Sequence, residues 1–83
     1  MEKEKIIEFI KKEVAKEFGE ERIKEIEYFG PYEGEDLNVI VYVEGIDEDK
    51  EGLKMHNKLF HKFLELGIDV PLDITRAKED EKL

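Results

Sequence analysis

Apolar residues recur at helical spacing in the first part of the chain. They are Ile6, Ile7, Ile10, Val14 and Phe18. This spacing aligns their side chains along one stripe of an α-helix, so we predict an amphipathic helix over residues 3–18 whose stripe faces the core. Gly19 follows directly, and glycine is a common residue just past the end of a helix.

Two segments with strand-like composition follow this helix. Residues 23–29 (IKEIEYF) are rich in strand-forming residues and end at the turn signal Gly30-Pro31. Residues 37–43 (LNVIVYV) alternate, so that one face of the strand carries only leucine and valine side chains. The short loop PYEGED joins the two segments, which predicts an antiparallel hairpin.

The pattern then predicts a second helix and a last strand. Asp47 or Asp49 can cap the helix, which ends at Gly67. Five apolar residues and one histidine recur at helical spacing before that glycine: Leu53, His56, Leu59, Phe60, Phe63 and Leu64. The last strand covers residues 68–75 (IDVPLDIT), with Ile68, Val70, Leu72 and Ile74 on one face. Pro71 cannot donate a ladder hydrogen bond, so we expect an edge position or a bulge there.

These elements predict an α+β domain with the order α-β-β-α-β and a three-stranded mixed sheet. Two helices can cover only one face of such a sheet. We expect the other face, bearing Asp36, Asn38 and Asp73, to be open to solvent or to a partner. The domain should extend over residues 1–76, followed by a charged tail over residues 77–83. The expected core residues are Leu37, Val39, Val41, Leu72 and Ile74, with Ile6, Ile10, Val14, Phe60 and Phe63 packed on them.

Charge and composition narrow the class of protein. The 83 residues carry a formal net charge of −9 and only two arginines, so we do not expect nucleic-acid binding, which needs clustered cations. The lack of cysteine excludes disulfides and cysteine-ligated zinc. No segment approaches the roughly 20 apolar residues of a membrane span, and the charged N-terminus is unlike a signal peptide, so we expect a cytoplasmic protein. The enrichment in glutamate and lysine favours a thermophilic source.

Residue types also exclude several chemistries. The chain contains neither serine nor cysteine, so it has no nucleophile of either kind. His56 and His61 are five residues apart on the second helix, which separates them by about 140° around its axis. A metal-binding histidine pair on a helix has a spacing of three or four, so these residues are not expected to share an ion.

The stretch from Tyr28 to Val41, YFGPYEGEDLNVIV, resembles the signature of the minimal nucleotidyltransferases. These are small relatives of DNA polymerase beta that often act as antitoxins beside a helical toxin. In that family a strand ends in Phe-Gly-Ser-Tyr, and a loop containing Gly-Glu follows. An Asp-x-Asp pair then opens a hydrophobic strand, and a third aspartate lies on a later strand after a helix.

The resemblance implies roles for four positions. Gly30 matches the nucleotide-binding glycine, Asp36 the first metal-binding carboxylate and Asp73 the third. Asn38 falls where the second carboxylate belongs. In active members these carboxylates hold two Mg²⁺ ions, which activate the attacking oxygen and stabilise the leaving phosphate. Mg²⁺ would therefore be the cofactor if this chain were active.

Two of these positions depart from the family pattern. Asn38 is neutral, and Pro31 replaces the serine and so removes a hydroxyl and a backbone N–H. The loop between Gly30 and Asp36 is also short. The resemblance therefore implies a catalytically degenerate domain without a cofactor, which acts as an antitoxin-like binding or regulatory partner of another protein.

Three other interpretations stay open. The chain could be an unrelated small α/β interaction module that forms a homodimer through its open sheet face. Ile40, Tyr42 and, if it shares that face, Tyr28 would give this surface an apolar centre. It could be an active Mg²⁺-dependent nucleotidyltransferase. Asp36, Asn38 and Asp73 could also be ordinary turn and surface residues.

Overall fold

The computed structural model describes residues 2–78 and contains the predicted order of elements, α-β-β-α-β. The helices and strands are α1 (Lys3–Phe18), β1 (Ile23–Phe29), β2 (Asn38–Val43), α2 (Leu53–Leu66) and β3 (Leu72–Arg76). A short 3₁₀ turn, Glu20–Arg22, precedes β1, and a short π-helical turn, Glu48–Gly52, precedes α2. The part of the predicted tail beyond residue 78 lies outside the described residues.

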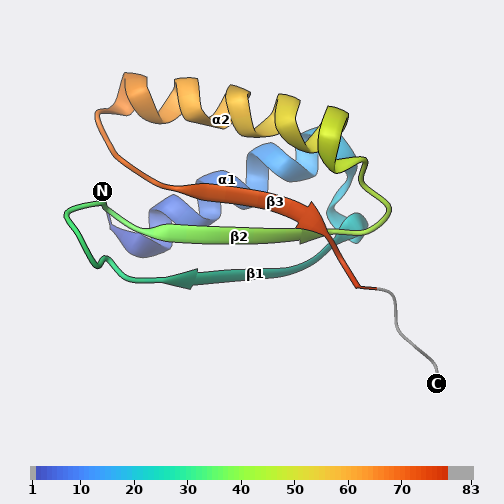
Figure 1. Cartoon of the computed structure of the whole chain (residues 1–83), viewed down its shortest axis with the longest axis horizontal. Coiled ribbons are helices and arrows are strands. Elements are labelled where there is room, and N and C mark those ends of the chain that lie inside the picture. The colour runs from blue at the N-terminus through green and yellow to red at the C-terminus, as the bar shows by residue number, and fades with distance from the viewer. Residues whose placement is uncertain (1, 79–83) are drawn as a thin grey trace.

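The three strands form one mixed sheet, as predicted, and β2 lies at its centre (Figure 1). β1 pairs with β2 in the antiparallel direction, and β2 pairs with β3 in the parallel direction. A parallel pair needs a crossover connection, and α2 supplies it. β1 and β3 are therefore the two edge strands of the sheet.

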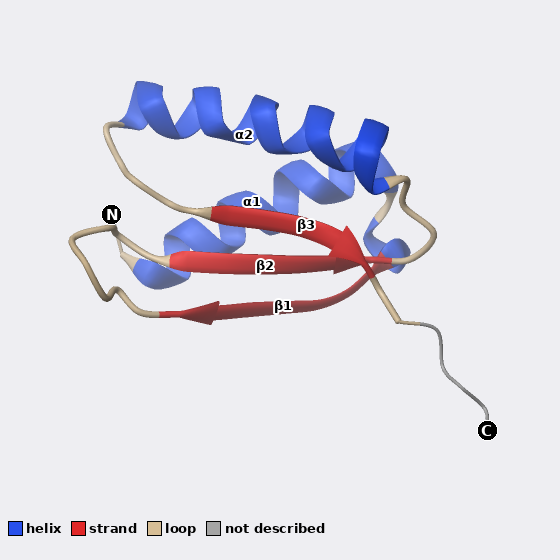
Figure 2. Ribbon diagram, viewed as in Figure 1, coloured by secondary structure: helices blue, strands red, loops and turns tan. Residues whose placement is uncertain are grey.

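Both helices lie on the same face of the sheet (Figure 2). The core between helices and sheet confirms most of the predicted buried residues and adds several from the connections. Its buried members are Ile6, Ile10, Val14, Leu37, Val39, Val41, Val43, Ile46, Met55, Leu59, Phe63, Val70 and Ile74. The burial of each large apolar side chain contributes roughly 1.5–3 kcal/mol, so this cluster is the main source of stability.

Two expectations about the core are wrong. Phe60 is half exposed rather than buried, and Leu72 is only partly buried. The reason is geometric, because α2 lies over the edge strand β3 and one flank of the helix extends past the sheet (Figure 1). The apolar positions of α2 therefore occupy a wider arc than the three-stranded sheet can cover.

The last strand is shorter than predicted and is displaced toward the C-terminus. It starts at Leu72 rather than at residue 68, directly after Pro71. Proline has no N–H to donate, although its carbonyl oxygen still accepts from the Val39 N–H at 3.0 Å. At the other end Ala77, predicted to lie in the charged tail, is buried and donates its N–H to Val43 O at 3.0 Å.

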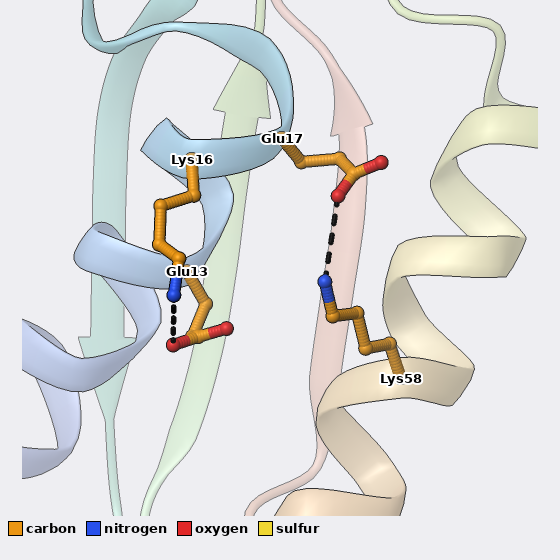
Figure 3. Close-up of polar contacts among 4 residues, drawn as sticks. All are labelled: Glu13, Lys16, Glu17 and Lys58. Atoms are coloured by element: carbon orange, nitrogen blue, oxygen red, sulfur yellow. Dashed lines mark hydrogen bonds and ion pairs between the residues drawn. The ribbon is translucent and has the colours of Figure 1, made fainter.

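One ion pair links the two helices, and another lies within α1. Lys58 of α2 lies 3.4 Å from the Glu17 carboxylate of α1, and Figure 3 shows this contact across the gap between the helices. Glu13, although mostly buried, keeps its carboxylate 3.6 Å from Lys16 one turn later. The exposed Lys58–Glu17 pair contributes little to stability compared with the buried core.

The connection to α2 is capped as the sequence predicts. The Asp47 carboxylate accepts from the N–H groups of Asp49 and Lys50 at 3.1 and 3.3 Å. Such side-chain acceptors satisfy the free N–H groups at a helix start. Asp47 is therefore the capping residue, and the alternative, Asp49, lies inside the turn that it caps.

Val41→Asp should unfold the domain. The Val41 side chain is 0% exposed at the centre of β2. An unpaired buried carboxylate costs several kcal/mol, comparable to the roughly 3–5 kcal/mol that a core of this size supplies. We expect no cooperative thermal transition by circular dichroism. Phe60→Asp, at a half-exposed position, should keep the transition. Wild-type melting of Val41→Asp, or unfolding of the control, would contradict the assignment of faces.

Candidate functional site

The sheet face that no helix covers is a continuous surface built from all three strands. The pairing of β1 with β2 places Phe29 opposite Asn38, Glu27 opposite Ile40 and Glu25 opposite Tyr42. Residues directly opposite each other share a face. In the parallel pair, Asp73 lies beside Ile40 and Thr75 beside Tyr42. We refer to these eight residues as the open face: Glu25, Glu27, Phe29, Asn38, Ile40, Tyr42, Asp73 and Thr75.

Tyr28 does not belong to the open face. It pairs with the buried residue Val39 and so points to the helix side of the sheet. The ammonium group of Lys3, at the start of α1, lies 5.5 Å from the centre of the Tyr28 ring, which agrees with that orientation. The apolar centre of the open face therefore consists of Ile40, Tyr42 and Phe29.

Carboxylates surround this apolar centre. The Tyr42 hydroxyl donates to Glu27 Oε1 at 3.0 Å. This hydrogen bond raises the pKa of Tyr42, with further contributions from partial burial and from the negative charges of Glu27, Glu25 and Asp73. The residues responsible come from β1 and β3, on both sides of Tyr42. The open face thus combines an apolar centre with a negative potential.

The loop between β1 and β2 is closed by the carboxylate of Glu35. This group accepts from the backbone N–H groups of Tyr32 and Glu33 at 2.7 and 2.8 Å, and from Asn38 Nδ2 at 2.6 Å. These donors lower the pKa of Glu35 to about 2, and the Tyr32 N–H makes the largest contribution. The N–H groups of the turn therefore already bind an anion, which the chain itself supplies.

Gly30 has a structural reason to be glycine. Its φ angle is 85°, a conformation that side chains disfavour, and a Cβ atom there would lie 2.7 Å from Asn38 Nδ2. The Asn38 amide needs this space because it donates to Phe29 O at 3.3 Å as well as to Glu35. The structure thus brings two predicted site residues, Gly30 and Asn38, together through packing and hydrogen bonds.

Asp36 holds the hairpin loop to the connection between α2 and β3. Its Oδ2 atom accepts from the Asp69 N–H at 2.7 Å, and its own N–H donates to Asp69 O at the same distance. These two hydrogen bonds join the segments that precede β2 and β3, just before the parallel ladder starts at Val39 and Leu72. The Asp36 carboxylate therefore has a structural partner, which sequence reasoning did not anticipate.

The candidate metal ligands Asp36 and Asp73 lie in different places, Asp36 in the loop before β2 and Asp73 within β3. Asp73 lies beside Ile40 in the sheet. Ile40 is four residues after Asp36, and four residues of extended chain span about 13 Å. Two Mg²⁺ ions need hard oxygen ligands that converge within a few ångströms. Within residues 2–78, no three histidine, aspartate or glutamate side chains are grouped so that they could hold a metal ion. The described residues therefore do not fit a pair of Mg²⁺ ions.

The two histidines lie apart on α2. His56 is partly buried beside β3, and its Nδ1 atom has no hydrogen-bond partner among the described residues. His61 is exposed, with its ring 6.0 Å from that of Phe60. Neither histidine contributes to the open face or to the loop.

Comparisons of the chain with protein-family models, with curated proteins and with solved structures find no match. Over residues 2–78, no helix is long and apolar enough to cross a membrane. The site must therefore be interpreted from its own geometry and from the sequence resemblance.

Several residues of the site were missed at the sequence level. Glu35 lies in a short, strongly acidic loop, where nothing distinguishes it from Glu33. Glu25 and Glu27 are alternate residues of β1, so their shared face could have been read from the strand period. The bulge between Ile23 and Glu25, however, shifts the register with β2, and only the structure shows which residues they oppose.

The titration of Glu35 should be visible at low pH. Its folded-state pKa of about 2 lies below the ordinary value of 4.5. The carboxylate therefore stabilises the loop fully above pH 4.5, and this stabilisation is lost as the pH falls toward 2. By NMR, we expect the amide resonances of Tyr32 and Glu33 to move with a midpoint near 2. Glu35→Gln should abolish that transition, and a wild-type midpoint near 4.5 would contradict the hydrogen-bonding scheme.

Proposed function

We propose that this chain is a non-catalytic, nucleotidyltransferase-like domain that acts by binding another protein through its open face. The observation that carries the proposal is the uncovered sheet face, with Ile40, Tyr42 and Phe29 at its centre. An apolar surface with a polar rim is typical of interaction sites. The resemblance to the minimal nucleotidyltransferases adds an antitoxin-like, regulatory role.

The hydrogen bonds of the loop support the absence of catalysis. The N–H groups of Tyr32 and Glu33 bind Glu35, and the Asp36 carboxylate binds the Asp69 N–H. A nucleotide phosphate or a metal ion would have to displace these internal partners. Pro31 offers no N–H in exchange, and Asn38 offers no negative charge.

The charge of the open face supports a basic partner. Glu25, Glu27 and Asp73 surround the apolar centre, and like charges across an interface cost several kcal/mol. A second copy bound through the same face would bring two such sets of carboxylates together. A partner surface with lysine or arginine around an apolar side chain would complement the face and would also bind faster, because opposite charges steer the encounter.

Calorimetric titration with Mn²⁺ and ATP tests the absence of catalytic function. We expect weak or no binding by the wild type. Pro31→Ser combined with Asn38→Asp should raise the Mn²⁺ affinity by about tenfold, equivalent to roughly 1.4 kcal/mol. The reason is that the new carboxylate would lie beside that of Glu35, where a cation relieves their repulsion.

The two outcomes of this titration bear on different parts of the proposal. Tight binding of Mn²⁺ and ATP by the wild type would show that the site is functional and would reject the non-catalytic assignment. A double variant that folds but gains no Mn²⁺ affinity would count against the resemblance to the nucleotidyltransferases, and would leave the open face as the basis for binding.

A cationic peptide tests the charge of the proposed partner. The probe is a short peptide with lysine and arginine flanking one tryptophan, followed by NMR at low salt. We expect its largest shifts at Ile40 and Tyr42. Glu25→Lys with Asp73→Lys should weaken binding by at least about tenfold. Glu4→Lys with Glu8→Lys, which changes the net charge equally on α1, should change it less than about twofold. Equal losses in both variants would contradict a specific site.

A further inference from the structure

A row of exposed apolar side chains lies on the side of α2 that extends past the sheet. Leu53, Phe60 and Leu64 are 55%, 50% and 60% exposed, and their spacing of seven and four residues aligns them along one side of the helix. Single exposed apolar residues are ordinary, but several large ones gathered on one side of a helix are typical of a binding surface. This row is separate from the apolar centre of the open face, which lies on the other side of the sheet.

Two hollows lie along this row at the edge of the sheet. One, of about 290 Å³, lies beside Phe60 and Leu64. The other, of about 320 Å³, lies beside Leu53. His56 and Leu72 line both hollows, so the two are parts of one groove between α2 and β3. We refer to this surface, defined by Leu53, His56, Phe60, Leu64 and Leu72, as the α2–β3 groove.

The charged side chains that line the α2–β3 groove are all carboxylates: Glu48, Asp49, Asp69 and Asp73. Within residues 2–78, no lysine or arginine lines it. Lys58 instead reaches toward α1, where it contacts Glu17 (Figure 3). Lys54 and Lys62 lie one turn before and after Lys58, on the same side of α2. The groove therefore combines exposed apolar side chains with a border of negative charge.

The backbone of β3 is covered at the Leu53 end of the groove. The Glu48 carboxylate accepts from the Arg76 N–H and from Thr75 Oγ1, both at 2.7 Å. The turn before α2 also lies against this edge, because a Cβ atom on Gly52 would be 3.2 Å from Ile74 O. An edge strand covered in this way hinders the addition of another strand. The groove therefore offers side chains, rather than backbone hydrogen bonds, to a partner.

We propose that the α2–β3 groove binds an amphipathic helix of another protein, in which lysine or arginine flanks a row of apolar residues. Leu53 and Leu64 are eleven residues apart, about 16 Å along the axis of α2. Apolar residues at positions i, i+4, i+7 and i+11 of a partner helix have the same span and match this mode of recognition.

The charge of the groove selects a cationic partner. Lysine or arginine on the partner helix would face Asp49 at one end of the groove and Asp69 at the other, and opposite charges across an interface provide specificity. A second copy of this chain bound through the same groove is disfavoured, because a twofold contact would bring the carboxylates of both grooves together.

Titration with a cationic helical peptide tests the groove. The probe is a peptide of about 16 residues, or about four helical turns, with leucine at positions i, i+4, i+7 and i+11 and lysine at most other positions. By NMR of the labelled protein, we expect the largest shifts at Phe60, Leu64 and Leu72. The same peptide with proline at two central positions cannot form the helix, and it should bind at least about tenfold more weakly.

One pair of substitutions tests the apolar side chains. Phe60→Ala with Leu64→Ala removes two exposed side chains without changing the charge, and alanine is compatible with the helix. The melting temperature should stay close to that of the wild type, whereas the affinity for the helical peptide should fall by at least about tenfold. Phe29→Ala is the matched control, because Phe29 is a comparably exposed (41%) aromatic residue on the open face. It should leave the affinity unchanged.

A second pair tests the acidic border. Asp49→Lys with Asp69→Lys reverses two exposed charges of the groove and should weaken binding of the helical peptide by at least about tenfold. Glu25→Lys with Glu27→Lys changes the net charge equally on the open face, at a distance where salt screens the effect. This control should change the affinity less than about twofold.

The results that would overturn the proposal are specific to the groove. They are no binding of the helical peptide, equal binding of the proline-containing peptide, unchanged affinity after Phe60→Ala with Leu64→Ala, or equal losses in the two charge variants. Shifts confined to Ile40 and Tyr42 would also overturn it, and would leave the proposed function of the open face standing. Asp73 alone belongs to both surfaces, and because none of these variants changes it, the two proposals can fail separately.

Discussion

The packing of two helices against one face of a three-stranded sheet determines which surfaces of this molecule are available for binding. α1 and α2 cover the valine side of β2, and the buried apolar cluster lies between these helices and the sheet. The opposite side of the sheet has no element to cover it. Because α2 lies over the edge strand β3 (Figure 1), its residues Leu53, Phe60 and Leu64 stay outside the core.

The charge of the open face limits which surfaces can complement it. The open face surrounds Ile40 and Tyr42 with Glu25, Glu27 and Asp73. The exposed side of α2 next to β3 is also bordered by carboxylates, those of Glu48, Asp49, Asp69 and Asp73. Electrostatic complementarity mainly controls specificity and the rate of encounter. A basic surface would therefore complement the open face better than a second copy of the same acidic face would.

The loop that resembles a nucleotide-binding turn has the chemistry of such a turn, but its ligand is internal. Backbone N–H groups converge on the Glu35 carboxylate as they would on a phosphate oxygen. The same carboxylate positions Asn38, and the space over Gly30 accommodates that contact. A loop closed in this way satisfies its N–H groups without an external ligand.

The sequence by itself determined the element order, the bounds of α1 and β1, and the buried side of β2, because local hydrophobic periodicity encodes them. The tertiary structure decided how α2 lies over β3, and with it the exposure of Phe60. It also decided the partners of Asp36 and Glu35, since the Asp69 N–H lies 33 residues from Asp36 along the chain. Contacts between distant residues depend on the register of the strands and on the geometry of the crossover through α2. A local hydrophobic pattern does not determine either of them. The acidic character of the whole chain was evident from composition, but its concentration around Tyr42 required three strands to be brought side by side.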